Sequence, residues 1–324
     1  NRYVIPVKSE FRGQVKGFIH DQSASGSTLF VEPMEVLELN NDLRTATLEE
    51  QAEVERILAE LTAKTGLIAS RLENNAEILC ELDCAFAKAV YAYRTKATKP
   101  KLNANGYINI PKGRHPLIDP EKVVPVSLSL GSGYNYLLIT GPNTGGKTVT
   151  LKLTGLFSVM AATGYFVQAA DGVNISVFDR IFVDVGDEQS IEQNLSTFSS
   201  HMKNLIEITE SVNDKSLVLV DEMGAGTDPD EGSALARAIL ERLVEKKSFG
   251  IVTTHYSALK EYAFTRDEVM NASMDFDEET FAPLYKLNIG MAGSSNAIKI
   301  ALRLGLSPEI ADKANSFLSE RKVS

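Results

Sequence analysis

The eight residues at positions 141–148 constrain this chain more than any other part of its sequence. They read Gly-Pro-Asn-Thr-Gly-Gly-Lys-Thr, the spacing G-x-x-x-x-G-K-T. An apolar, strand-like run at 136–140 precedes them, and a run with helical character follows from Val149. In a strand–loop–helix of this kind, backbone N–H groups surround phosphate oxygens, an approach that side chains on the glycines would block. The helix N-terminus adds partial positive charge. The segment therefore predicts a nucleoside triphosphate site.

Two side chains of this loop carry most of the predicted chemistry. Lys147 is expected to reach the β- and γ-phosphates of ATP, and the Thr148 hydroxyl is expected to coordinate Mg²⁺. ATP and Mg²⁺ are therefore the expected cofactors. The residues predicted to bind the nucleotide are Gly141, Pro142, Asn143, Thr144, Gly145, Gly146, Lys147, Thr148 and Val149.

Two further apolar runs end in groups suited to hydrolysis. Residues 217–220 are followed by Asp221, which can hold Mg²⁺ through water, and by Glu222, which can polarise the attacking water as a general base. Residues 249–254 are followed by His255, a candidate sensor of the γ-phosphate. Solvated acids and an ordinary, satisfied histidine are the competing interpretations. Together with the loop, the pair of acids favours ATP hydrolysis over phosphotransfer to a small molecule.

The region from 101 to 324 has the pattern of an α/β domain. Its apolar runs at 136–140, 180–185, 217–221 and 249–254 alternate with helical runs. Continuous apolar runs of this length suit a buried, mostly parallel sheet with helices on both faces. Residues 98–106 before it are interpreted as a linker.

The first 34 residues predict a small β-rich part. Strand-like runs at 2–8, 15–20 and 27–31 are separated by turn residues. One acidic residue, Glu10, stands against several cations in the first 20 positions, which predicts a local basic patch. The cations are Arg2, Lys8, Arg12 and Lys16.

Residues 35–97 predict long helices. Apolar residues recur at helical spacing, with Glu and Lys on the other faces. One continuous helix would be roughly 90 Å long at 1.5 Å per residue. Two long helices, broken near Gly66 or near Asn74 and Asn75, are equally compatible with the pattern. The segment is either a plain helical bundle or a rigid lever that joins the basic strands to the α/β domain.

Composition excludes several classes of protein. The length of 324 residues suggests two or three domains, and a hydrophobic fraction of 44% supplies a sizeable core. No run of about 18 apolar residues is present, so no membrane span is expected. The net charge of −10 argues against a general nucleic-acid binder, because attraction to phosphate requires a positive surface. The chain starts at Asn1 without a Met and without an apolar signal segment, so we expect a fragment of a longer protein, located in the cytoplasm.

The cysteines and histidines do not indicate a metal or a disulfide. Cys80 and Cys84 are four residues apart on a predicted helix and are interpreted as small buried residues in a reducing cytosol. The four histidines show no ligand spacing, so a structural metal is not expected. They are His20, His115, His201 and His255.

Five segments, in this order, now point to a family. They are 141–148, 184–190 (Asp-Val-Gly-Asp-Glu-Gln-Ser), 195–202 (Leu-Ser-Thr-Phe-Ser-Ser-His-Met), 221–229 (Asp-Glu-Met-Gly-Ala-Gly-Thr-Asp-Pro) and 253–256 (Thr-Thr-His-Tyr). Together they resemble the ATPase of the MutS family, a branch of the ABC-type ATPases. The exact residues of these segments are similar to those of the second bacterial MutS paralogue. So is the segment at 21–33, Asp-Gln-Ser-Ala-Ser-Gly-Ser-Thr-Leu-Phe-Val-Glu-Pro. The resemblance implies a clamp at 1–34, a lever at 35–97 and an ABC-type ATPase domain at 101–324.

The resemblance also implies roles for particular residues. ATP would be sandwiched in a head-to-tail homodimer, with Ser196 contacting the γ-phosphate bound in the opposite subunit. Gln189 falls where these ATPases contact the metal and water, and Tyr285 falls where the family places an aromatic residue or histidine against adenine; a core aromatic is the alternative for Tyr285. The predicted catalytic residues are thus Glu222, His255, Ser196 and Gln189, and the predicted metal ligands are Thr148 and Asp221.

The resemblance implies two classes of partner. One is branched DNA, with suppression of recombination, and the other is the collided ribosome, split into subunits through rRNA contacts. The basic strands suit either, because phosphate contacts carry no sequence information, and the acidic remainder favours the ribosome. Another ABC-type machine, either an SMC-like DNA ATPase or a transporter subunit, is the competing class, and a small-molecule kinase is a third. The family's mismatch-reading domain and the paralogue's small nuclease domain are absent from this sequence, so nuclease activity is not assigned.

Overall fold

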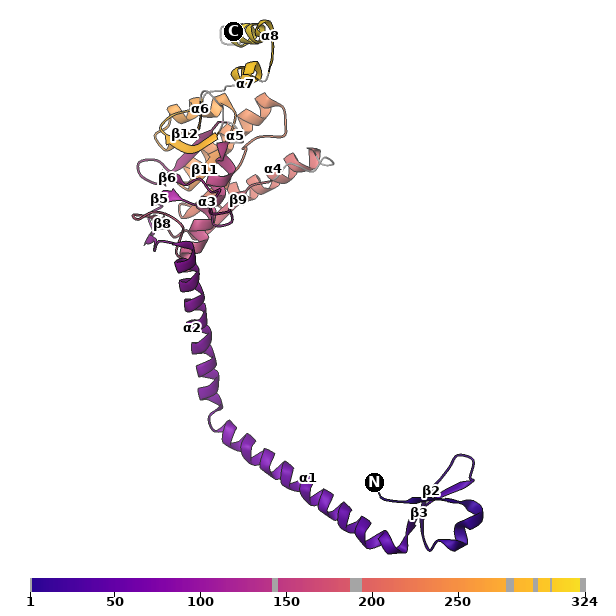
Figure 1. Ribbon diagram of the computed structural model, residues 1–324. Coiled ribbons are helices and arrows are strands. Elements are labelled where there is room, and N and C mark those ends of the chain that lie inside the picture. The colour runs from indigo at the N-terminus through magenta and orange to yellow at the C-terminus, as the bar shows by residue number, and fades with distance from the viewer. Residues whose placement is uncertain are drawn as a thin grey trace. The chain divides into compact units, whose positions relative to one another are not determined.

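The computed structural model of the protein describes residues 2–141, 145–186, 194–277, 283–293, 297–303 and 305–320. The chain divides into two compact units, Asn1–Cys84 and Ala85–Ser324 (Figure 1). Each unit has its own hydrophobic core or helical framework and is described separately.

The first unit begins with a three-stranded antiparallel sheet in the order β1-β3-β2. The strands are β1 (Ile5–Lys8), β2 (Gly17–Gln22) and β3 (Thr28–Pro33), and a short 3-10 helix, η1 (Ser9–Gln14), connects the first two. Val7, Leu29 and Val31 form a small core, against which Val15 packs. The three strands predicted from the first 34 residues are therefore confirmed.

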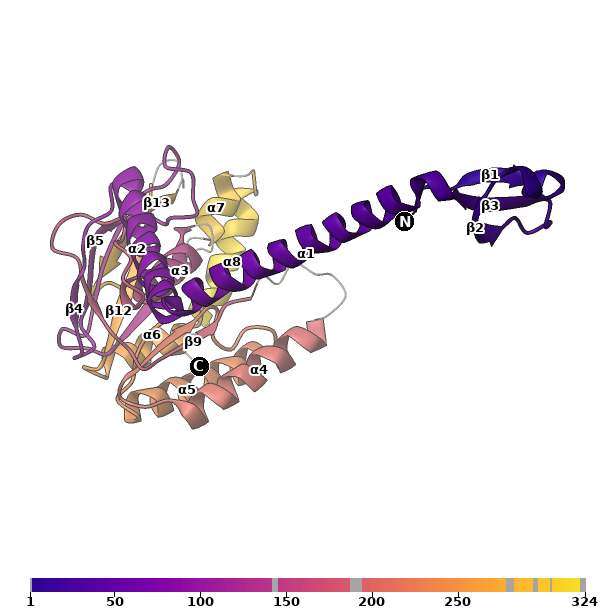
Figure 2. The same ribbon diagram turned by 90° about the horizontal axis from the view of Figure 1, so that it is seen from below.

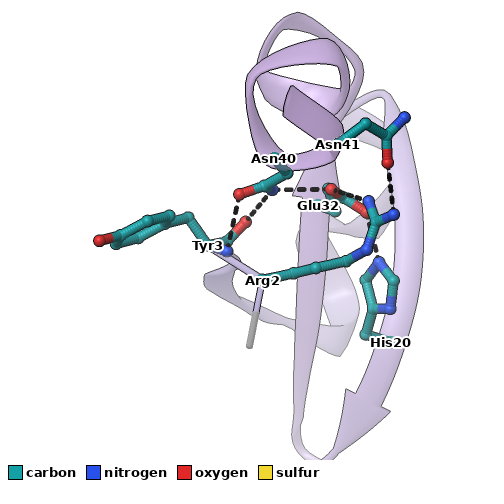
Figure 3. Close-up of polar contacts among 6 residues, drawn as sticks. All are labelled: Arg2, Tyr3, His20, Glu32, Asn40 and Asn41. Atoms are coloured by element: carbon teal, nitrogen blue, oxygen red, sulfur yellow. Dashed lines mark hydrogen bonds and ion pairs between the residues drawn. The ribbon is translucent and has the colours of Figure 1, made fainter. Parts of the chain in front are cut away.

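A buried carboxylate ties this sheet to the helix that follows. Glu32 is 1% exposed and accepts hydrogen bonds from Arg2 (2.6 Å), Asn40 (2.7 Å) and the His20 ring (2.5 Å), as Figure 3 shows. Burial alone would raise the pKa of Glu32, but the bonds from His20, Asn40 and Arg2 lower it below its usual 4.5. A carboxyl group with a lowered folded-state pKa stabilises the fold above its unfolded pKa. That contribution is lost as the pH falls through the folded value. Because its guanidinium donates to the buried Glu32 carboxylate, Arg2 has a structural role in the first unit.

We expect Asn40→Ala to destabilise the first unit by roughly 1–3 kcal/mol, because it removes three hydrogen bonds and leaves buried polar groups less satisfied. The Asn40 side chain accepts from the Tyr3 N–H and donates to the Tyr3 carbonyl and to Glu32. Hydrogen exchange of the β3 amides in the whole chain measures this effect. Asn41→Ala is the matched control, because Asn41 is exposed and accepts only one of the described bonds, from Arg2. Equal protection in both variants would contradict the role given to Asn40.

Two long helices follow the sheet, after a short 3-10 turn, η2 (Met34–Val36). Helix α1 (Leu37–Gly66) and helix α2 (Ala69–Thr95) are separated at Leu67 and Ile68, so the two-helix alternative with a break near Gly66 is correct. The continuous helix and the break at Asn74 and Asn75 are wrong. Cys80 and Cys84 are exposed, so their predicted burial is also wrong. Their stretch of α2 has no buried residue, because no described element covers it.

The second unit is built on a six-stranded sheet in the order β13-β12-β7-β11-β10-β9. Strands β12 to β9 in this order run parallel, and β13 is antiparallel at the edge. The predicted mostly parallel α/β sheet is confirmed. The strands are β7 (Tyr136–Thr140), β9 (Arg180–Asp184), β10 (Ser216–Val220), β11 (Phe249–Thr253), β12 (Val269–Phe276) and β13 (Pro283–Ile289).

The two faces of this sheet bury two separate cores because side chains alternate along each strand. On one face, Leu137 and Ile139 of β7 pack with α3 (Lys147–Ala162) and with a second sheet. On the other, Tyr136 and Leu138 pack with three helices. These are α4 (Asn194–Ser211), α5 (Pro229–Glu245) and α6 (Ser257–Phe264).

The second sheet has four short strands in the order β4-β8-β5-β6. They are β4 (Lys101–Asn103), β5 (Ile108–Gly113), β6 (Val126–Leu130) and β8 (Asn174–Ser176). Strand β4 lies within the stretch interpreted as a linker, which corrects that interpretation. It pairs with β8 over three residues, so its partner comes from a distant part of the chain.

The chain closes with α7 (Ala297–Arg303) and α8 (Pro308–Glu320). Among the helices of the described ranges, none is long and apolar enough to cross a membrane.

Candidate nucleotide site

The glycine-rich loop leaves the end of β7 and enters α3 at Lys147. Gly146 caps the helix with a φ of 95°, a left-handed conformation that favours glycine. A Cβ at this position would lie 2.9 Å from the Tyr285 ring, so a side chain there would also clash. Gly145 and Gly146 are buried, and Gly141 and Val149 are half-buried. Pro142, Asn143 and Thr144 lie outside the described residues.

Lys147 is 1% exposed, and its ammonium donates to the Gly141 carbonyl at 2.7 Å. Burial lowers the pKa of Lys147, while Glu222 and Asp221 act in the opposite direction. Within the described ranges, no carboxylate lies at ion-pairing distance from this ammonium. Among the described residues, the buried ammonium has one hydrogen-bond partner, which is an uncharged carbonyl. An anionic phosphate would supply the negative charge that a buried cation needs. The residue present therefore fits a nucleotide.

Thr148 brings the loop together with the first acid. Its hydroxyl donates to Asp221 Oδ2 at 2.6 Å, across 73 positions of sequence. Hydroxyl and carboxylate oxygens are hard ligands of the kind that Mg²⁺ prefers, and these two lie 2.6 Å apart at the start of α3. This donor set fits Mg²⁺.

Thr253, which the sequence analysis did not single out, organises both acids. It is fully buried at the end of β11, and its hydroxyl donates to Asp221 Oδ1 and accepts the Glu222 N–H at 2.8 Å. Glu222 has a φ of 49°, which is uncommon for a residue with a side chain. The hydroxyl of Thr253 thus helps to hold a strained carboxylate-bearing residue in place. The sequence signal that could have identified Thr253 is the Thr-Thr-His ending of the 249–255 run.

We expect Thr253→Val to lower the kcat of ATP hydrolysis by about tenfold, because the two acids lose a shared anchor and misplacement of catalytic groups is costly. The affinity for ATP should change much less, since Lys147 and the loop remain. Steady-state kinetics and nucleotide titration separate the two. Thr154→Val is the matched control, because among the described residues that buried hydroxyl bonds only to the Thr150 carbonyl of its own helix. A kcat equal to that of the control would contradict the anchoring role.

His255 follows β11 and is exposed. Its ring lies 4.3 Å from the Tyr256 ring, and Tyr256 donates to the Gly224 carbonyl at 2.9 Å. In the part of the chain that the structure describes, no hydrogen bond joins His255 to the loop or to the two acids. Its role as a sensor of the γ-phosphate therefore remains a prediction.

Tyr285 lies on β13, the edge strand. Its ring packs against Gly146, and its φ is 52°. The structure thus brings this aromatic side chain to the phosphate loop from a part of the sequence 139 positions away. Its contact with adenine remains a prediction.

Gln189 and Ser196 are the other two predicted catalytic residues. Gln189 lies outside the described residues. The backbone of Ser196 belongs to the first turn of α4, but its side chain lies outside the described residues.

The fold and the site define a P-loop ATPase domain. The description MutS domain V matches residues 137–322, which cover the loop, both acids, His255 and the C-terminal helices. The chain belongs to the MutS family and carries the P-loop ATPase domain of that family.

Individual relatives agree over the whole chain. It is 55% identical over 99% of its length to "Endonuclease MutS2" of Caldanaerobacter subterraneus subsp. tengcongensis. It is 54% identical over 98% to the protein of that name in a Geobacillus species, and 51% identical over 100% to that of Clostridioides difficile. The resemblance to the second bacterial MutS paralogue is therefore confirmed. The chain spans 41% of the length of each of these relatives.

Proposed function

We propose that this chain hydrolyses Mg²⁺-ATP with Thr148 and Asp221 holding the metal, Lys147 holding the phosphates and Glu222 as general base. The observation that carries the proposal is the 2.6 Å hydrogen bond from Thr148 to Asp221, which joins the loop and the acids at one edge of the parallel sheet. Ligands of open α/β sheets bind at the carboxyl ends of the strands. His255 and Gln189 are proposed to contact the γ-phosphate and the attacking water, and Tyr285 to contact adenine.

We further propose that the site is shared between two copies of the chain. Ser196 stands at the start of α4, and Glu222 lies at the end of β10 in the same subunit. In the proposed head-to-tail homodimer, each Ser196 completes the site of the other subunit.

Mixing inactive subunits tests this sharing. Ser196→Ala subunits keep their phosphate loop, and Lys147→Ala subunits keep their serine, so a mixture forms one complete site in each heterodimer. Activity of the mixture above the average of the two parents supports a shared site. Activity equal to that average, with heterodimers shown to form, would refute sharing. In addition, the specific ATPase rate of the unmodified chain should rise with protein concentration.

The proposed work of this ATPase is to move a clamp. We assign the clamp to residues 1–34, the lever to 35–97 and the ATPase domain to 101–324. Because Arg2 is paired with Glu32, the basic patch that remains for a partner consists of Lys8, Arg12 and Lys16, all exposed. A few cations on an otherwise acidic chain suit a large structured partner held at a few points. We therefore propose the collided ribosome, contacted at rRNA and split into subunits, as the partner.

Capture by a trapped protein tests the partner. Glu222→Gln protein, purified from cells after ATP loading, should carry ribosomal subunits. Recovery of branched DNA without ribosomes would instead favour suppression of recombination, and recovery of neither would refute the clamp proposal. Changing Lys8, Arg12 and Lys16 to Gln should weaken capture and reduce its salt dependence. Changing Lys152, Lys203 and Lys215, on exposed positions of the second unit, is the control.

Other ABC-type machines, whether SMC-like or a transporter subunit, are the competing class. The relatives are named as endonucleases, an activity that we do not assign to this segment.

A further inference from the structure

A buried carboxylate next to the proposed site has no part in the mechanism above. Asp184 is the last residue of β9 and is 3% exposed. Its backbone carbonyl accepts the Asp221 N–H at 2.9 Å, which places it beside the proposed metal ligand. Its side chain, however, is turned to α4.

Two residues one helical turn apart on α4 hold this carboxylate. His201 Nδ1 lies 2.9 Å from Oδ2, and Asn204 donates to Oδ1 at 3.1 Å. Because a carboxylate accepts, the bond requires the proton of His201 on Nδ1. A Cβ on Gly186 would lie 3.1 Å from both Cε1 and Nε2 of the same ring. The imidazole is therefore held by a carboxylate on one side and by backbone on the other.

The position of this contact on α4 matters because, among the described side chains, only those of the C-terminal part of the helix pack into the core. Leu205, Ile208 and Val212 pack into the core. Among the described side chains of α4, Leu205 is the first to be fully buried. Figures 1 and 2 both show the N-terminal end of α4 projecting beyond the body of the second unit. The first turns therefore depend on contacts outside the core.

Phe198 and His201 make two of these contacts. Phe198 packs on the loop after β10, where a Cβ on Gly226 would lie 3.4 Å from the Phe198 Cβ. The other is the group formed by Asp184, His201 and Asn204, which we call the α4 latch. Of its two residues on α4, His201 is the nearer to Ser196, five positions along the same helix.

We propose that His201 is a positioning residue, which the α4 latch uses to hold the first turns of α4 so that Ser196 meets ATP bound in the second subunit. The inference rests on the shared site proposed above. The parallel pairing of β9 with β10 is made by the backbone, so loss of the latch loosens the first turns of α4 while leaving Asp221 and its strand in place. The latch therefore serves the partner's ATP and has little effect on nucleotide bound to its own loop.

His201→Ala should consequently lower kcat by about tenfold, as expected for a displaced transition-state contact, with unchanged affinity for ATP. His201→Asn should recover most of the rate, because its amide N–H can take the place of Nδ1–H. Lys203→Ala, an exposed change on the same turn, is the control and should have the original rate. A rate unchanged in His201→Ala would overturn the proposal.

Subunit mixing decides which ATP the latch serves. If His201 acts through its own Ser196, mixing His201→Ala with Lys147→Ala raises activity above the parental average. Mixing His201→Ala with Ser196→Ala then gives no gain, because every site lacks a properly held serine. The reverse pattern would show that His201 acts on its own subunit's ATP, and gain in neither mixture would show a general structural defect. Either result overturns the proposal.

The mixture of Ser196→Ala with Lys147→Ala is run in parallel. If that mixture is more active than the average of its parents but the His201 mixtures do not show the expected pattern, the latch is rejected and the shared site is retained. Absence of gain there rejects the shared site itself.

Discussion

Glu222→Gln is expected to reduce ATP turnover by about 10²–10⁴-fold, the usual contribution of a general base, while ATP still binds. Gln has the same shape but cannot accept a proton from water. Glu222 already has a left-handed φ of 49° in the structure, and Gln carries the same backbone cost, so the fold should not change. If two copies of the chain share the site as proposed, the uncleaved nucleotide should also trap the dimer.

Single-turnover hydrolysis and nucleotide titration measure these two effects, and light scattering with ATP measures the dimer. Glu261→Gln is the matched control: it makes the same change of charge on an exposed position of α6 and should retain full turnover. Turnover of Glu222→Gln within a few-fold of this control would exclude Glu222 as the base.

Lys147→Ala is expected to weaken ATP binding by about 10²-fold or more, because charge-assisted hydrogen bonds contribute roughly 1.5–3 kcal/mol each and Lys147 is placed to make more than one. The buried position of this ammonium strengthens the argument. Burial lowers its pKa, so the folded protein already bears a cost that bound phosphate would offset.

Thermal unfolding with and without Mg²⁺-ATP measures this loss. A ligand at 100 times its Kd stabilises the folded state by about 2.7 kcal/mol, so the original chain should show an ATP-dependent rise in Tm that the variant lacks. Lys152→Ala, an exposed change on the same helix, should keep the rise. A normal rise in Lys147→Ala would contradict the loop assignment.

Features carried by contiguous segments were predictable. The glycine loop lies between a strand and a helix that are its direct neighbours in sequence, so local pattern sufficed for β7 and α3. Long apolar runs likewise predicted β9, β10 and β11. Strand β4, with three residues, has too little sequence for a pattern and owes its existence to pairing with β8.

Features that depend on which surfaces meet were not predictable. Cys80 and Cys84 occupy helical positions that local spacing could not distinguish as buried or exposed. The sequence placed Arg2 in the basic patch, whereas in the fold its guanidinium donates to Glu32. Thr253 stands in the Thr-Thr-His-Tyr segment, but that segment does not show that its hydroxyl joins the two acids; the contact arises because β11 lies between β7 and β10.

The sequence by itself determined a phosphate loop, an adjacent acid pair and membership of a family of ATPases, because these depend on residue types at fixed local spacing. The tertiary structure alone decided that Thr253 joins the two acids, that Tyr285 packs on Gly146 and that Asp184 holds α4 through His201. Each of these contacts joins residues from different elements. Strand order and helix packing bring them together, and those are set by the burial of whole faces rather than by any local pattern.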